Sequence, residues 1–345
     1  MNDASALSTE FTRLMPTTWI SDAQLRAVAE RVGTPAFVYS ETRLVENVER
    51  MQEAARAAGL LDRVAFYVPF FPNSNPHVVR AFKDMDIGVL IQLPSEYELL
   101  RRHGFEKFIV STGHISDAEI EFWAGTGQPV FLSSMDEVAH LITAAPEAPI
   151  NVRFDSLSSG KPGLKYNELY DFSELLKAHG GQLNCFELYC GSGNSVHTML
   201  SIVEQVFMIF KTYFPQAKAI NFAGGFSFAY EELATDAKHF RWDYYFQKLR
   251  ALADRFEIPS DVSFWFEPAR ENVRLARVIV LNPPRVTVKT ACSACLRSPS
   301  RSSRSVWARR LSPATRWPIG SRLSLDATPC RPPGRRLGRR DMQIM

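Results

Sequence analysis

The sequence predicts an α/β protein organised around a closed (β/α)8 barrel, and three observations lead to that prediction. Eight short apolar runs alternate with helix-like stretches over roughly 200 residues, the pattern of repeated strand–helix units. The chain has 345 residues, 46% of them hydrophobic, so it can bury a large core. Glycines and charged side chains directly follow several of these runs, as expected where barrel strands end at an active face.

The predicted barrel strands are eight in number, which favours a closed barrel over a doubly wound open sheet with the same alternation. The helix before the first strand places Leu44, Val48 and Met51 on one face, with Glu46 elsewhere. The helix over 196–214 is apolar on most sides, so we expect it to be well buried. The eight strand-like runs are 64–68, 86–91, 108–111, 129–132, 150–154, 184–189, 218–222 and 262–266.

Two further strand-like runs lie outside the barrel count, and we expect them to belong to a second, incomplete β domain. The run at 36–40 precedes the first barrel strand, and the run at 274–282 follows the last one, so the two could pair. The chain then divides into an N-terminal segment with one strand of the β domain, the barrel, the start of a truncated β domain and a basic tail, at residues 1–40, 41–273, 274–289 and 290–345.

The net charge of +3 is unevenly distributed along the chain. Residues 285–345 carry 13 Arg and 1 Lys against 2 Asp and no Glu, whereas residues 1–284 hold 26 basic and 35 acidic side chains. The acidic body gives no support for a nucleic-acid partner. The tail is interpreted either as a disordered basic arm that binds nucleic acid or, as we prefer, as GC-rich DNA translated out of frame, which would make the chain a truncated gene product.

Composition also limits the compartment and the metal chemistry. No apolar stretch is long enough to span a membrane, and the N-terminus lacks the basic and apolar regions of a signal peptide, so we expect a cytoplasmic protein. Cys185 and Cys190 lie in an apolar, strand-like stretch and are expected to be reduced thiols. Cys292 and Cys295 form a lone C-x-x-C without a second pair, so no metal site is expected.

The ends of the last two predicted strands carry groups suited to a phosphorylated ring. The seventh strand is followed by Gly224 and Gly225, and glycines let backbone N–H groups approach an anion closely. The eighth is followed by Glu267 and Arg270, and a carboxylate can hold a heterocyclic nitrogen while an arginine clamps phosphate. A tight turn and an ordinary salt bridge are the alternative explanations for these two pairs.

The fifth and sixth predicted strands end in polar residues as well. Tyr189 is placed to lie flat against a ring, and Ser192 lies in a small-residue loop suited to phosphate oxygens. Arg153 lies at the end of the fifth strand, before a polar loop, and is a candidate cofactor-binding residue. Tyr189 has the alternative of being a core aromatic. Four consecutive strand ends therefore offer phosphate donors, an aromatic face and a carboxylate, and this combination is more specific than any one of its members.

These motifs resemble those of the fold type III pyridoxal 5'-phosphate (PLP) decarboxylases, the ornithine, diaminopimelate and arginine decarboxylase family with its alanine racemase-like barrel. The resemblance covers the chain from about Thr34 to Pro284 and implies PLP as cofactor, an amino acid as small-molecule substrate and loss of CO2. It also implies a homodimer if the second domain were complete. The matching stretches are "NSNPHVVRAF", "RFDSLSSGKPGL", "ELYCGSG", "INFAGGF" and "FEPAR".

The resemblance also assigns roles to the residues at the strand ends. Glu267 would hold the pyridine nitrogen, and Tyr189 would stack on the ring where the family uses histidine. Leu90 stands where the family often has Asp, and Ala223 and Ala269 stand where it has Gly. The phosphate would be held by Ser192, Gly224, Gly225 and Arg270.

The stretch "VAFYVPFFPNSNPHVV" at 64–79 departs most from the family. There the family reads Y-A-V-K-A-N-S-N, and its lysine forms a Schiff base with PLP. Alignment on the Asn-Ser-Asn triplet at 73–75 puts Phe71 at the lysine, and a shift of one residue puts Phe70 there. We therefore hypothesise a PLP-dependent decarboxylase-like protein. The alternatives are a catalytically inactive PLP-binding barrel or truncated pseudoenzyme and, less favoured, a basic-tailed nucleic-acid binder.

Overall fold

A computed structural model describes residues 19–155, 160–181, 183–227, 240–272, 277–280, 289–290 and 343–344. Contacts divide the chain into two compact units, a barrel unit and a smaller strand-containing unit. Within the described residues, no helix is long and apolar enough to cross a bilayer. The predicted tail at 290–345 lies outside the described residues, apart from residue 290 and residues 343–344.

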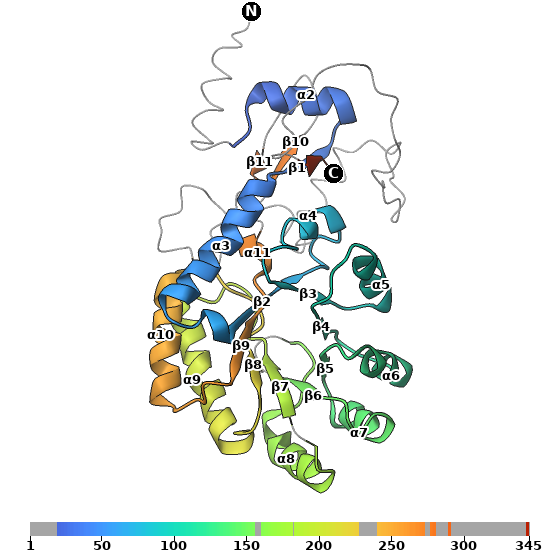
Figure 1. Cartoon of the computed structure of the whole chain (residues 1–345), viewed down its shortest axis with the longest axis vertical. Coiled ribbons are helices and arrows are strands. Elements are labelled where there is room, and N and C mark those ends of the chain that lie inside the picture. Colours follow the sequence, from blue (N-terminus) through green and yellow to red (C-terminus); the bar gives the residue numbers. More distant parts are fainter. Residues whose placement is uncertain are drawn as a thin grey trace, which may run out of the picture. The chain divides into compact units, whose positions relative to one another are not determined.

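Eight parallel strands close into a barrel and follow one another around it in sequence order (Figure 1). The last strand pairs with the first, with Ala65 opposite Trp265, so no strand edge is left open. The predicted (β/α)8 barrel is thereby confirmed, and the open sheet is excluded. The strands are β2 (Val64–Pro69), β3 (Gly88–Ile91), β4 (Phe108–Ser111), β5 (Val130–Leu132), β6 (Ile150–Phe154), β7 (Leu183–Leu188), β8 (Ala219–Asn221) and β9 (Ser263–Phe266).

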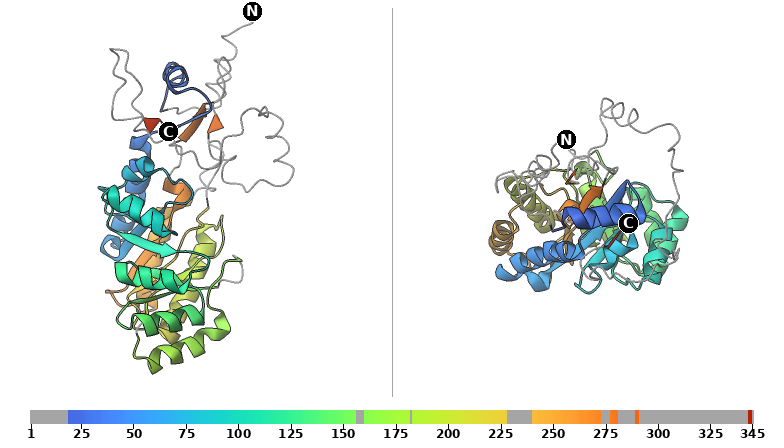
Figure 2. Two further views of the ribbon diagram at one scale, coloured as in Figure 1. Left: turned by 90° about the vertical axis from the view of Figure 1, so that its right-hand side faces the viewer. Right: turned by 90° about the horizontal axis from the view of Figure 1, so that it is seen from above.

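Helices surround the ring of strands, as the three views of Figures 1 and 2 show. Local sequence signals start several of them: Asn75 caps the helix that Pro76 opens, and the Ser195 hydroxyl accepts a hydrogen bond from the Thr198 N–H. The helices of the barrel are α3 (Glu41–Ala57), α4 (Pro76–Arg80), α5 (Pro94–Arg102), α6 (Asp117–Thr126), α7 (Met135–Ala144), α8 (Leu169–Ala178), α9 (Val196–Tyr213), α10 (Trp242–Arg255) and α11 (Ala269–Asn272).

The predicted apolar faces of two helices can be compared with their burial. On α3 the predicted face is buried, including Leu44, Val48 and Met51. Helix α9 is buried on one side, for example at Phe207, but Met208 next to it is 51% exposed. The expectation that this helix is well buried therefore holds for one face of α9 only. An outer helix of a barrel packs with one face only, and its apolar composition exceeded what that face required.

Side-chain alternation along the strands separates the inside of the barrel from the outside. Phe66 points outward and packs edge-on against Trp242 and Phe246 of α10. Tyr67, the next residue, packs inside the barrel, as does the fully buried thiol of Cys185. The interior cluster consists of Tyr67, Leu90, Ile109, Phe131, Cys185 and Ala219, with Ala65 and Trp265 against it.

The smaller unit contains a four-stranded antiparallel sheet in the order β11-β10-β1-β12. Strand β1 (Ala36–Tyr39) pairs with β10 (Arg277–Val280), which is the pairing expected from the two runs outside the barrel. Strands β11 (Lys289–Thr290) and β12 (Gln343–Ile344) pair with β10 and β1 respectively. Helix α2 (Asp22–Val32) of this unit begins with a reciprocal cap between Ser21 and Gln24.

Candidate functional site

Loops after β7, β8 and β9 meet at the carboxyl ends of these strands. The backbone N–H of Glu267 donates to the carbonyl of Ala223 at 2.7 Å, which joins the ends of β9 and β8. The N–H of Asn194 donates to the carbonyl of Gly225 at 2.9 Å, which joins the loop after β7 to the same glycine loop. The predicted glycine loop therefore adjoins both Glu267 and the loop that carries Ser192.

Backbone packing alone requires glycine at positions 224 and 225, the two glycines that were predicted to bind phosphate. A Cβ on Gly224 would lie 2.6 Å from the carbonyl oxygen of Glu267, and one on Gly225 would lie 1.9 Å from that of Gly191. Gly225 also has a φ of +89°, and Ala223 adopts a φ of 53°, which costs an alanine more than a glycine. Close packing of the loops therefore accounts for Gly224 and Gly225 without a ligand.

The loop around Ser192 has a different character. Gly191 and Gly193 flank this serine with φ values of +87° and +83°, and a Cβ on either would meet nothing within 4 Å. The hydroxyl of Ser192 lies 2.9 Å from that of Tyr189. The backbone here is therefore open on its outer side and presents a hydroxyl, which is the kind of surface that accepts phosphate oxygens.

Glu267 is a buried carboxyl group at the end of β9. Its Oε1 accepts a hydrogen bond from Asn221 Nδ2 at 2.8 Å, while Asn221 Oδ1 accepts one from the Ala223 N–H at 2.9 Å. The backbone bond to Oδ1 fixes which end of the amide faces the carboxyl group. Burial, and then the charge of Glu187, raise the pKa of Glu267 to about 8, although the Asn221 hydrogen bond and the charge of Arg153 act to lower it.

Arg153 and Glu187 form a buried ion pair between β6 and β7. Arg153 Nε donates to Glu187 Oε1 at 3.0 Å, and Ser111 Oγ donates to Glu187 Oε2 at 2.8 Å. The Arg153 guanidinium also contacts the Ser111 hydroxyl and donates to the Thr112 carbonyl at 3.0 Å. The guanidinium is thus engaged with protein groups, and Arg153 is only 3% exposed.

Sequence reasoning missed Glu187 as a site residue, although a signal was present. Glu187 stands two residues before Tyr189, so both follow the same alternation along β7 and its end. Glu187 is the first residue of the matching stretch "ELYCGSG", two residues before the tyrosine that stands where the family uses histidine. On β3, Leu90, where the family often has Asp, lies buried in the barrel interior.

Lys161 is a second site residue that sequence reasoning left out. Its Nζ lies 4.7 Å from the centroid of the Tyr189 ring. Its positive charge also acts to lower the pKa of Glu267. The signal in the sequence was the matching stretch "RFDSLSSGKPGL", in which Lys161 stands at a family lysine other than the one that forms the Schiff base.

Arg270 and Phe71 complete the set of predicted residues. Arg270 is half-buried in α11, three residues after Glu267. Phe71 follows the end of β2 by two residues and is 49% exposed, whereas Phe70 before it is buried. Alternation with Tyr67 makes Pro69 the inward-facing residue at the end of β2. The structure therefore joins the predicted residues of β6 to β9 and leaves Phe71 in the turn after β2.

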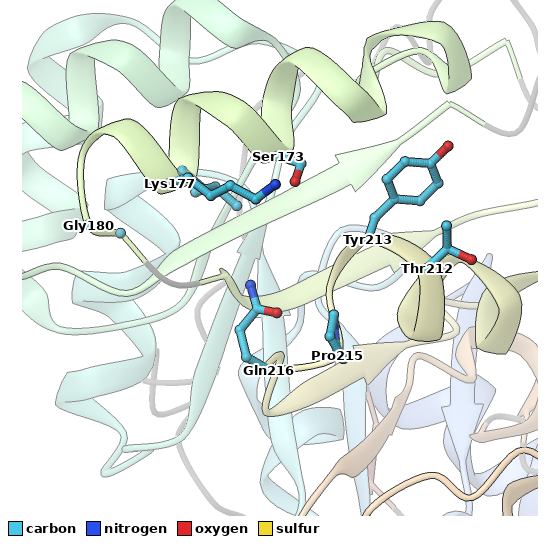
Figure 3. Close-up of a pocket in the computed structure, with 9 residues that line it drawn as sticks. Ser173, Lys177, Gly180, Thr212, Tyr213, Pro215 and Gln216 are labelled. Carbon is cyan, nitrogen blue, oxygen red and sulfur yellow. The ribbon is translucent and has the colours of Figure 1, made fainter.

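A separate pocket of about 460 Å³ opens at the other end of the barrel (Figure 3). Ser173 and Lys177 line it from α8, and Tyr213 lines it from the end of α9. The other lining residues lie near the ends of α8 and α9 and in the turns that lead into β7 and β8. Because barrel enzymes work at the carboxyl ends of their strands, we do not assign the candidate site to this pocket. The lining residues are Ser173, Leu176, Lys177, Gly180, Gly181, Thr212, Tyr213, Pro215 and Gln216.

The chain forms a closed (β/α)8 barrel with polar side chains at its strand ends, and comparisons with known proteins show which proteins it resembles. No family model matches the sequence. Over 130 residues the chain is 25% identical to a diaminopimelate decarboxylase of Methanothermobacter thermautotrophicus. That match covers 37% of this chain and 30% of the relative, so it spans less than a third of the relative's length.

Solved structures of amino-acid decarboxylases share the fold. Lysine decarboxylase from Selenomonas ruminantium superposes with a TM-score of 0.62 at 16% identity, covering 76% of this chain and 69% of that one. Lysine/ornithine decarboxylase from Vibrio vulnificus, complexed with putrescine, gives 0.63 at 16%, covering 75% and 70%. Diaminopimelate decarboxylase from M. jannaschii, in complex with L-lysine, gives 0.63 at 16%, covering 73% and 65%. The chain is thus similar to the fold type III decarboxylases, as its motifs indicated.

Replacement of Glu267 by Gln should make the free energy of unfolding less dependent on pH. The folded-state pKa of about 8 lies above the ordinary 4.5, so the folded protein keeps this proton after the unfolded chain has released it. The stability contributed by this group is present below the unfolded pKa and is lost as the pH rises through the folded one. Urea unfolding of both proteins between about pH 5 and about pH 9 measures the difference.

The matched control for this titration is Glu174→Gln, which neutralises an exposed carboxylate that pairs with Lys177 on α8. Wild type and this control should lose stability in parallel as the pH rises, and Glu267→Gln should lose less. If all three proteins share one pH dependence, Glu267 does not hold a proton near neutral pH.

Proposed function

We propose that the barrel binds PLP at the carboxyl ends of β6 to β9 and that the chain is a PLP-dependent amino-acid decarboxylase-like protein. The observation that carries this proposal is the position of Glu267. It is a buried carboxyl group that Asn221 and Ala223 tie to the glycine loop, and this loop adjoins the open loop around Ser192. One carboxyl group and one phosphate-binding surface therefore lie on neighbouring strand ends, as a phosphorylated pyridine requires.

The phosphate would be held by the loops after β7 and β8 together with Arg270. Ser192 supplies a hydroxyl, and the open backbone at Gly191 and Gly193 allows close approach of an anion. Gly224 and Gly225 bring the loops close enough together for both to contribute, and Arg270 at α11 would add a charge-assisted contact.

The pyridine ring would lie between Tyr189 and Glu267. The hydrogen bond to Ser192 ties the Tyr189 ring to the phosphate loop, and stacking on its face is the proposed contact. Glu267, with a pKa of about 8, can share a proton with a basic ring nitrogen at neutral pH. When bound, PLP supplies an electron-poor ring that accepts the electron pair released with CO2.

Arg153 is proposed to act through Glu187 rather than by touching the cofactor. Its guanidinium neutralises the Glu187 carboxylate inside the barrel and contacts Ser111. Without that cation, two carboxyl groups would share a dry interior, which would disfavour ionisation of Glu267 further. Arg153 would therefore hold the Glu187 carboxylate in place and place a positive charge near Glu267.

The proposed substrate is a small-molecule amino acid. Structures with the same fold were solved with L-lysine, putrescine, agmatine or cadaverine, and those ligands belong to the proteins concerned. A homodimer, a cytoplasmic location and the absence of nucleic-acid partners remain proposals from the sequence. So do the segment boundaries at 1–40, 41–273, 274–289 and 290–345.

A second function, that of a PLP-binding barrel without turnover, is favoured by one specific observation. The end of β2 and the turn after it offer Pro69, Phe70 and Phe71, none of which carries an amine. We propose that Phe71 stands at the position of the family's Schiff-base lysine. The two functions differ in whether a bound cofactor leads to release of CO2.

Release of CO2 from a panel of amino acids, with PLP added, separates the two functions. The decarboxylase proposal expects PLP-dependent release from at least one amino acid at a rate above that of free PLP. PLP bound at one site per chain, with release no faster than that of free PLP, would instead establish the non-catalytic barrel. No bound PLP at all would exclude both.

Arg270→Ala should weaken PLP binding by about 1.5–3 kcal/mol, the usual contribution of a charge-assisted hydrogen bond, which corresponds to roughly tenfold or more in Kd. Quenching of tryptophan fluorescence by added PLP measures the affinity. Arg250→Ala is the matched control, because Arg250 pairs with Asp254 on the outer helix α10. Equal affinities for all three proteins would remove Arg270 from the site.

Phe71→Lys should create a new covalent attachment point for PLP if Phe71 stands where the family has its lysine. After borohydride treatment, mass mapping of peptides should find a phosphopyridoxyl group at residue 71. Phe122→Lys is the matched control, because Phe122 is a comparably exposed phenylalanine on α6. A Phe71→Lys protein that binds PLP but carries no label at residue 71 contradicts this register.

A further inference from the structure

The lysines of the described part of the chain differ in what lies around their amino groups. Lys161 Nζ lies against the ring of Tyr189, the proposed stacking residue, and its charge acts on Glu267. Six other described lysines have partners elsewhere on the barrel. These pairs are Lys107 with Asp86, Lys165 with Asp155, Lys177 with Glu174, Lys211 with Glu257 and Lys218 with Asp261, and Lys248 lies over Tyr244.

Backbone contacts hold the segment that carries Lys161 against the end of β6. The N–H of Leu164 donates to the Arg153 carbonyl, and the N–H of Asp155 donates to the Leu164 carbonyl, both at 2.9 Å. Gly163 packs so closely that a Cβ there would lie 2.7 Å from the Asp155 nitrogen. Lys161 is thus two residues before a fixed point at the carboxyl end of a barrel strand.

A continuous series of contacts links this amino group to the proposed phosphate loop. Lys161 Nζ faces the Tyr189 ring at 4.7 Å, and the Tyr189 hydroxyl lies 2.9 Å from the Ser192 hydroxyl. Gly191 and Gly193 leave the backbone on both sides of Ser192 open. An amine, an aromatic face and an anion-binding loop therefore lie in one local arrangement.

We propose that Lys161 is the residue to which an aldehyde cofactor of the PLP type becomes covalently attached in this chain, in place of a lysine on β2. The inference rests on the proposed function, because it needs PLP bound at these strand ends. The segment after β6 would thus provide the amine for covalent attachment, because the turn after β2 has none.

The covalent step needs no oxidant or reductant. The Lys161 ammonium loses a proton to solvent, and the neutral amine adds to the aldehyde carbon. The carbonyl oxygen then leaves as water, so that a C=N bond replaces the C=O bond. Phosphate and ring contacts would hold the aldehyde near the Lys161 amine. The effective concentration of aldehyde would then be higher at Lys161 than at surface lysines.

Reduction with borohydride tests the inference on the full-length chain. The protein is incubated with PLP at a concentration equal to that of the chain, and borohydride then delivers hydride to the imine carbon and leaves a stable C–N bond. Peptide mapping by mass spectrometry should find the phosphopyridoxyl group mainly at Lys161. Lys161→Arg keeps the positive charge over Tyr189 but lacks a reactive amine, so labelling should fall by at least about tenfold.

Two controls separate this inference from the proposed PLP site. Lys165→Arg, four residues further along the same segment, should keep the label on Lys161. Pyridoxamine phosphate has the ring and phosphate without the aldehyde, so it should bind to wild type and to Lys161→Arg alike and should block labelling of wild type.

The outcomes that overturn the inference are distinct from those that overturn the proposed function. Undiminished labelling of Lys161→Arg, or a label spread evenly over several surface lysines, rules out Lys161 as the attachment point. If pyridoxamine phosphate still quenches tryptophan fluorescence in that case, the PLP site itself stands. If it does not bind to wild type, both the proposed site and the attachment at Lys161 are wrong.

Discussion

The arrangement of the candidate site depends on one buried interaction, the hydrogen bond from the Asn221 amide to the Glu267 carboxyl group. The same amide accepts the Ala223 N–H, and Glu267 in turn donates its backbone N–H to the Ala223 carbonyl. These three bonds join the ends of β8 and β9 into a closed loop. An unpartnered carboxyl group at this depth would cost several kcal/mol, so the amide both satisfies Glu267 and fixes where it lies.

The protonation of the two buried carboxyl groups, Glu187 and Glu267, depends on the cations near them. Arg153 contacts Glu187, Ser111 and the Thr112 carbonyl, and its charge, together with that of Lys161, also acts on Glu267. Glu187 has a direct ion pair with Arg153, whereas the hydrogen-bond partner of Glu267 is a neutral amide, and burial raises the pKa of Glu267. A barrel interior with a spare proton at Glu267 suits a ligand with a basic nitrogen, which is the electrostatic basis of the proposed function.

Much of the fold could be predicted because apolar runs and turn residues report on each strand separately. The eight barrel strands and the buried face of α3 follow from such local patterns. The Arg153–Glu187 pair does not, since it depends on the register of β6 against β7, which brings these two residues side by side. The contact of Lys161 with Tyr189 depends on how a loop folds back onto its strand, and no periodicity encodes that. Sequence reasoning therefore found the strand ends but not the pairs formed across them.

At strand β2, the register inferred from the motif alignment differs from the register that the inward-facing residues of the barrel define. Alignment on the Asn-Ser-Asn triplet counts backward from a turn, and turns tolerate inserted residues. Counting forward from Tyr67, which packs inside the barrel, makes Pro69 the inward residue at the strand end and leaves Phe71 half-exposed in the turn. The two counts agree on one point, that no amine stands at this strand end. An amine for a bound aldehyde would then come from another strand end, and Lys161 beside Tyr189 is the residue proposed to supply it.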